Sequence, residues 1–182
     1  AVKGDLNVGG IVGTMNIEYD VDPEFDMDLT KTTNIALRST VNCVVISCIN
    51  YGDANAKKNC AGGITGLQEL GLIYGSEGYG SVLSDAGSYA GGIVGNSASA
   101  VSDSYSLCNV EGKDYAGGIA GRCDNTIRDS YVLSGVSGDG YVGGVAGRGE
   151  DISGNYVCAY LDMDSYVKSS GAAKQALKDA PI

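Results

Sequence analysis

The sequence Gly91-Gly92-Ile93-Val94-Gly95 returns along the chain in nearly the same form, and this repetition decides the fold. The other copies are Gly9-Gly10-Ile11-Val12-Gly13, Gly62-Gly63-Ile64-Thr65-Gly66, Gly117-Gly118-Ile119-Ala120-Gly121 and Gly143-Gly144-Val145-Ala146-Gly147. The last three copies begin 26 residues apart, and the step before them is 29. A fixed period of this size is typical of stacked-repeat proteins. The first step is 53 residues, close to two periods, which indicates a degenerate copy or an insertion.

Each repeat contains two or three short apolar runs that are separated by Gly, Ser, Asp and Asn. This pattern is typical of short strands joined by turns, and no part of the array favours a helix. We therefore predict an all-β fold, a parallel β-helix of about 26-residue rungs over residues 1–165. Equivalent residues would stack in inward columns, namely Ile64, Ile93, Ile119 and Val145, then Leu107 over Leu133, and Val110 over Val136.

The glycine pairs are predicted to form the corner of every rung. A glycine is needed where a Cβ would clash with the neighbouring rung or where φ must be positive. The predicted corner residues are Gly9, Gly10, Gly62, Gly63, Gly91, Gly92, Gly117, Gly118, Gly143 and Gly144.

Two segments depart from the period. Residues 14–40 are predicted to be an irregular insertion or a degenerate rung, and they carry alternating carboxylates from Glu18 to Asp28. These carboxylates indicate either a calcium site or a solvated face, and the solvated face is favoured because no glycine interrupts the run. Residues 41–48 read as a buried strand. Residues 166–182 are predicted to be a tail with a short helix at 169–178, which would be a cap or a linker.

The composition narrows the range of functions. The chain has 182 residues, a net charge of −10 and no histidine. The negative charge argues against binding to nucleic acid or to an anionic membrane, and no apolar run approaches the length of a spanning helix. The missing histidine removes the commonest general base and zinc ligand, so we expect no catalytic residue and no cofactor. The absence of a leader and the abrupt ends favour an excerpt of a longer protein.

Two sets of tyrosines recur at fixed distances from the glycine pairs. Tyr79, Tyr105 and Tyr131 lie twelve residues before three of the pairs, and Tyr89, Tyr115 and Tyr141 lie just before them. Exposed aromatic rings in a flat row would form a face that binds sugar or peptide. Rings packed along the rungs would instead be structural ladders, which is the favoured interpretation.

Six cysteines, namely Cys43, Cys48, Cys60, Cys108, Cys123 and Cys158, suit an exported protein with disulfides. Their spacing does not suggest a metal site. On the 26-residue alignment no two cysteines share a column on neighbouring rungs, although Cys43 with Cys123, or Cys48 with Cys60, could pair across turns. The alternative is that most of them are small buried apolar residues.

The Ala-Gly-Gly-Ile-Val-Gly phrase, followed by a Ser/Asn-x-Tyr phrase, resembles the GLUG motif of bacterial surface proteins. The likeness covers residues 60–160, with fainter copies at 1–13 and 42–55. In Ser47-Cys48-Ile49-Asn50-Tyr51-Gly52 the motif's cysteine is kept, whereas Ser104 and Ser130 replace it, and Cys108 and Ser134 replace its last glycine. The resemblance implies an extracellular, repeat-built and non-catalytic segment.

These observations favour a rigid spacer or adhesive scaffold in a bacterial surface or secreted protein. Its partners would be other domains of the same polypeptide and a host or cell-surface glycan or protein. One alternative is a carbohydrate- or protein-binding module that uses the tyrosine and acidic columns. A third hypothesis, a polysaccharide-degrading β-helix enzyme, would depend on the aligned acids Asp103 and Asp129.

Overall fold

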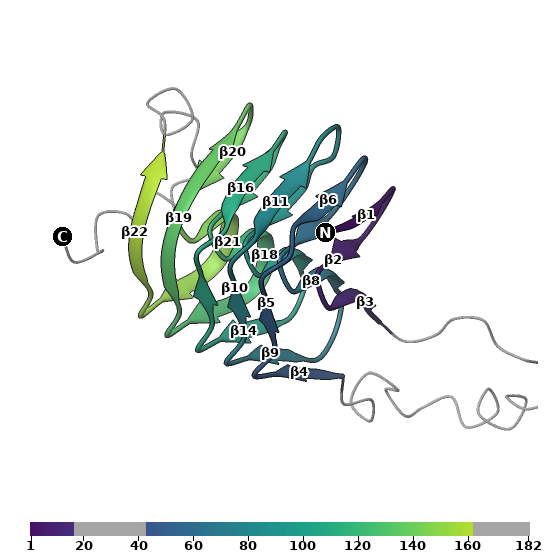
Figure 1. The fold of residues 1–182 in the computed structure, drawn as a ribbon. Coiled ribbons are helices and arrows are strands. Elements are labelled where there is room, and N and C mark those ends of the chain that lie inside the picture. The colour runs from purple at the N-terminus through teal and green to yellow at the C-terminus, as the bar shows by residue number, and fades with distance from the viewer. Residues whose placement is uncertain (17–42, 162–182) are drawn as a thin grey trace, which may run out of the picture.

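The computed structural model describes residues 1–16 and 43–161, with side chains described up to residue 157. The described strands wind into a β-solenoid of about four turns, and the fold prediction is confirmed (Figure 1). All of the described strand pairs are parallel, and no described residue is helical. The acidic run at 18–28 and the helix candidate at 169–178 lie outside the described residues.

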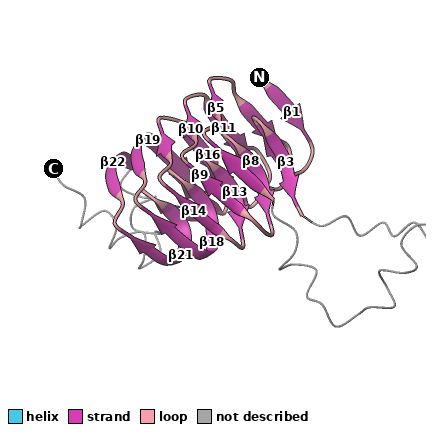
Figure 2. Ribbon diagram, turned by 90° about the horizontal axis from the view of Figure 1, so that it is seen from below, coloured by secondary structure: helices cyan, strands magenta, loops and turns pink. Residues whose placement is uncertain are grey.

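Three parallel sheets form the faces of the solenoid. Sheet A contains β1 (Val2–Gly4), β6 (Ala54–Ala56), β11 (Ser81–Ser84), β16 (Asn109–Gly112), β19 (Tyr131–Gly138), β15 (Tyr105–Ser106), β10 (Glu77–Gly78), β5 (Ile49–Asn50) and β22 (Tyr156–Leu161). Sheet B contains β2 (Val8–Gly9), β7 (Ala61–Gly62), β12 (Tyr89–Gly91), β17 (Tyr115–Gly117) and β20 (Tyr141–Gly143). Sheet C, seen in Figure 2, contains β3 (Val12–Met15), β8 (Thr65–Gln68), β13 (Val94–Ser97), β18 (Ala120–Arg128), β14 (Ala100–Ser102), β9 (Leu72–Tyr74), β4 (Val44–Ile46) and β21 (Ala146–Ser153).

The 53-residue step between the first two glycine phrases is a single rung with an insertion. Strand β2 pairs directly with β7, and β3 and β4 lie side by side with β8 and β9 of the same next rung. Residues 17–42 therefore interrupt one rung between β3 and β4. Without them the step is 27 residues, which is one ordinary turn. The expected boundary at residue 14 shifts slightly, because β3 continues to Met15.

The core follows the predicted columns with one exception. Ile64, Ile93, Ile119 and Val145 are each fully buried, and each is joined to the next by a backbone hydrogen bond. Val110 pairs with Val136, and both are buried. The inward placement of Leu107 and Leu133 was wrong. Residues alternate across a strand, so the buried Val132 directs Leu133 outward, where it is 49% exposed.

In each glycine phrase the chain bends at the second glycine and at the residue after it. The reason for glycine is steric. A Cβ on Gly63, Gly92 or Gly118 would overlap the carbonyl oxygen of the equivalent glycine on the next rung. None of the glycine pairs has positive φ, so a left-handed backbone is not the reason for glycine at these corners. The glycines with positive φ are Gly71, Gly75 and Gly154.

In the described part of the chain, the first rung lies at one end of the stack. Ile11 belongs to the same column as Ile64 but is 48% exposed, and Val2, Leu6, Val44, Ile46 and Ile49 are also exposed. The prediction that residues 41–48 form a buried strand was therefore wrong for most of β4, in which only Val45 is buried. Among the described strands, β4 has a neighbour on one side only, so its apolar side chains lack a covering rung.

Candidate functional site

Tyr89, Tyr115 and Tyr141 form the column that the sequence predicts. They occupy equivalent positions in β12, β17 and β20. The ring centroids of Tyr89 and Tyr115 lie 5.3 Å apart with planes 19° apart, and those of Tyr115 and Tyr141 lie 5.1 Å apart at 11°. The rings therefore turn their faces toward one another along the solenoid axis and do not lie as a flat exposed row.

The other predicted column contains an alignment error. The backbone of Tyr105 pairs with Glu77, not with Tyr79, and Tyr79 is equivalent to Leu107. The ring of Tyr79 nevertheless meets the column from this offset position, stacking on Tyr51 at 4.9 Å and meeting the edge of Tyr105 at 6.2 Å. Tyr131 continues the contacts, 6.5 Å from Tyr105 and 5.0 Å from Tyr156. Sequence reasoning missed Tyr51 and Tyr156.

One tyrosine column has a hydrogen bond within its own segment, and the other has one that comes from sheet C. The Tyr79 hydroxyl donates to Glu77 Oε2 at 2.5 Å, and this bond, followed by desolvation, raises the pKa of Tyr79 to about 12. The guanidinium of Arg122 forms a bidentate pair with Asp124, with N–O distances of 2.8 and 2.6 Å. Its pKa is raised first by Asp124 and then by a hydrogen bond to Tyr89, which links the second column to sheet C.

The aligned acids Asp103 and Asp129 lie at a corner whose backbone is left-handed on every rung. Their φ values are 50° and 51°, and the equivalent residues Ser47, Gly75 and Gly154 also have positive φ. Asp, Asn and Gly tolerate this conformation better than other residues. Both carboxylates are exposed, and the left-handed backbone is by itself a reason for aspartate at both positions.

A column of small polar side chains directly follows this corner, and its members are hydrogen-bonded from rung to rung. The sequence analysis did not predict this ladder. The column contains Cys48, Ser76, Ser104, Ser130 and Asn155. The Ser104 hydroxyl accepts a hydrogen bond from the Ser76 amide and donates to the Ser102 carbonyl at 2.9 Å. Ser130 repeats the pattern with the Ser104 amide and the Arg128 carbonyl. The signal in the sequence was the replacement of the motif cysteine by Ser104 and Ser130.

The cysteines whose side chains are described, Cys43, Cys48, Cys60, Cys108 and Cys123, are all free. Neither of the pairings that the sequence left open, Cys43 with Cys123 and Cys48 with Cys60, is formed. The register explains this, because Cys43 lies beside Gly71, Cys48 beside Ser76 and Cys123 between Ser97 and Gly149. Cys60, Cys108 and Cys123 are buried, as the alternative interpretation expects.

We expect the buried thiols to resist alkylation in the folded protein. Desolvation raises the pKa of Cys60 and Cys108 to about 11, and that of Cys123 is raised for the same reason. A rise of two units lowers the thiolate fraction at pH 8 about 100-fold. Iodoacetamide labelling followed by peptide mass spectrometry should modify Cys43 and Cys48 first.

Denaturation provides the control, because all of these cysteines should react in guanidinium chloride.

The raised pKa of the buried thiols also predicts how the free energy of unfolding depends on pH. Between about pH 9 and 11 the unfolded thiols lose protons that the folded ones retain, so the stability present below pH 9 falls as the pH rises through this window. Equal labelling rates for Cys43 and Cys108 in the native protein would contradict the buried placement.

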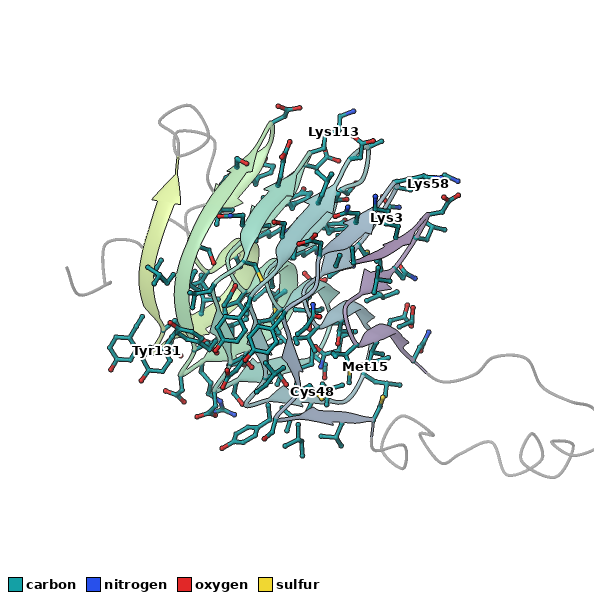
Figure 3. The ribbon with its side chains drawn as sticks, viewed as in Figure 1. Lys3, Met15, Cys48, Lys58, Lys113 and Tyr131 are labelled. Carbon is teal, nitrogen blue, oxygen red and sulfur yellow. The ribbon has the colours of Figure 1, made fainter. Side chains whose placement is uncertain are left out.

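The outer face of sheet A has a shallow depression with a volume of about 520 Å³ over β6, β11, β16 and β19. Figure 3 shows Lys58 and Lys113 at one edge of this face and Tyr131 at the opposite edge, with Lys3 on β1, in register with Asn55. Within the described ranges, no three His, Cys, Asp or Glu side chains gather as a metal site. The same ranges contain no helix that could cross a membrane.

No protein-family model, curated protein or solved structure matches this chain.

Proposed function

We propose that this chain is a non-catalytic repeat segment of a bacterial surface or secreted protein, in which GLUG-like repeats form a rigid spacer or adhesive scaffold. The observation that carries the proposal is the face-to-face stacking of Tyr89, Tyr115 and Tyr141. Rings that stack on one another leave little ring face for a ligand but stiffen the junction between rungs. The resemblance to surface proteins supports an extracellular location and attachment to further domains.

The in-register pairing of the sheets supports the same role. Ala90 pairs with both Ala61 and Ala116, and Gly91 pairs with both Gly62 and Gly117. Sheet B therefore keeps the same register from rung to rung, and adding a rung lengthens the rod. A protein of this kind has quasi-one-dimensional energetics, in which stability is a sum over neighbouring repeats.

The spacer role predicts that whole rungs can be removed or added. Deletion of residues 118–143 removes one rung of 26 residues and joins Gly117 to Gly144 in the original phase. This variant, the parent chain and chains with one or two duplicated copies of the segment should all fold cooperatively. The maximum dimension from small-angle X-ray scattering should rise by about 4.8 Å per rung, which is the spacing of neighbouring strands.

A half-rung deletion is the matched control. Removal of residues 118–130 joins Gly117 to Tyr131, so the chain passes from sheet B directly to sheet A without the sheet C strand β18, and this variant should fail to fold. The spacer proposal would be abandoned if the duplicated chains were no longer than the parent or if they lost cooperative unfolding.

A further inference from the structure

We propose that the depression on sheet A binds an uncharged oligosaccharide that lies along the solenoid axis. Its volume of about 520 Å³ is within the range of small-ligand sites. The depression spans four consecutive strands of sheet A, so its long direction crosses the rungs. A ligand with its own repeat along one axis suits a surface that also repeats along that axis.

Two rows of outward side chains line the depression. The first row contains Asp53, Ser81 and Asn109, and the second contains Asn55, Leu83 and Glu111. Their inward neighbours Ala54, Val82 and Val110 are buried, which fixes the outward direction of both rows. The Asp53 carboxylate is already oriented, because its Oδ1 accepts a hydrogen bond from the Ser81 amide at 2.9 Å.

The depression is bordered by larger side chains than those on part of its floor. The next outward row toward the tyrosines contains Tyr51, Tyr79, Leu107 and Leu133, whose side chains are large. The floor includes Ser81, Gly135 and Ser137, whose side chains are small or missing. On the far side the strands end in turns that carry Lys57, Lys58 and Lys113. The small floor between larger walls produces the concavity.

The chemistry of the lining favours a sugar over a peptide. The backbone groups of β11 and β16 are used in pairing with the strands on either side, so a ligand on this face meets side chains only. Extended peptides are usually bound through free backbone groups at a sheet edge. Carboxylate, amide and hydroxyl groups beside an aliphatic side chain instead match the hydroxyls and the apolar C–H face of a sugar.

The charge of the lining selects against acidic glycans. Asp53 and Glu111 are exposed in the lining of the depression. The lysines near it lie outside the lining: Lys3 extends the second row onto β1, and Lys57 and Lys58 are paired with Asp5. An acidic glycan would place like charges next to these carboxylates, which costs binding energy. An uncharged glycan has no such penalty, and its binding should depend only weakly on salt.

The test uses the whole chain against hexasaccharides of cellulose, xylan, mannan, starch and chitin, with polygalacturonate and heparin as acidic comparisons. We expect measurable binding by isothermal titration calorimetry to at least one uncharged hexasaccharide at both low and high salt. Glu111→Gln, which removes one charged acceptor, should weaken that binding about tenfold, the change expected from losing one such hydrogen bond. Ser81→Trp, which fills the floor, should abolish it.

Glu150→Ala is the matched control, because Glu150 is exposed on β21 in sheet C, away from the depression. It should leave the affinity unchanged, and thermal melts should show that all variants are folded. The proposal is overturned by no binding to any uncharged hexasaccharide, by binding to the acidic glycans alone, or by equal affinity in the Glu111→Gln and Glu150→Ala variants. The spacer role is tested separately, by the length of chains with deleted or duplicated rungs.

Discussion

Gly118→Val should lower the free energy of unfolding by about 3 kcal/mol or more, the upper end of the cost of overpacking a closely packed site. Gly118 is buried at the corner between β17 and β18. A Cβ at this position would overlap the Gly144 carbonyl oxygen and a methyl group of Val132. The carbonyl belongs to the backbone of the next rung, so the clash can be relieved only by separating two rungs.

The measurement is urea denaturation followed by far-ultraviolet circular dichroism. Gly135→Val is the matched control, since a Cβ on Gly135 would meet only the Oδ1 atom of Asn109, at 3.1 Å. That amide can rotate toward solvent, and valine favours a strand, so we expect a change within about 1 kcal/mol. Equal stability of the two variants would show that the corner does not need glycine.

The isoleucine column could be predicted because it stands at a fixed place inside the glycine phrase. Ile64, Ile93 and Ile119 follow the glycine pair directly, with no turn of variable length between the pair and the column. Any correct alignment of the phrases therefore also aligns the column. The same reasoning applies to Tyr89, Tyr115 and Tyr141, each of which is separated from the phrase by a single residue.

Tyr79 was misaligned because the turns between sheets A and B differ in length. Four residues, 85–88, connect β11 to β12, whereas two residues, 113 and 114, connect β16 to β17. Counting twelve residues back from each glycine pair crosses these turns and shifts Tyr79 by two positions, from the column of Leu107 to that of Tyr105. An even shift keeps a side chain on the same face, so the tyrosine was still correctly expected near its column.

The outer depression and the serine ladder depend on features that a periodic pattern does not show. The depression exists because Gly135 and Ser137 are small where the neighbouring row has Leu133 and the tyrosines. That contrast appears only after strands from four rungs are placed side by side. To predict the ladder, one must know that Ser104 points inward after a left-handed corner. The sequence does not reveal this corner, because residues as different as Ser47, Gly75 and Asp103 occupy it.

Ser104→Ala should lower the free energy of unfolding by about 2–3 kcal/mol, because it leaves buried polar groups without partners. The Ser104 side chain is fully buried, and its hydroxyl serves the Ser76 amide and the Ser102 carbonyl together. Alanine removes both interactions while filling almost the same volume, and the site is fully buried. The loss should appear as a lower urea midpoint with an unchanged slope.

Two further variants separate the hydrogen bonds from packing. Ser104→Asn places the side chain found at Asn155 in the middle of the column, where its oxygen can accept from the Ser76 amide, as Asn155 Oδ1 accepts from the Ser130 amide at 3.0 Å. We expect it to recover part of the loss, despite its larger size. Ser137→Ala, which removes an exposed hydroxyl 3.5 Å from the Val110 carbonyl oxygen, should cost less than about 0.5 kcal/mol. If Ser104→Ala lowered the free energy of unfolding no more than Ser137→Ala does, the ladder would not be among the interactions that hold successive rungs together. Its serines would then be present only because the left-handed corner places them there.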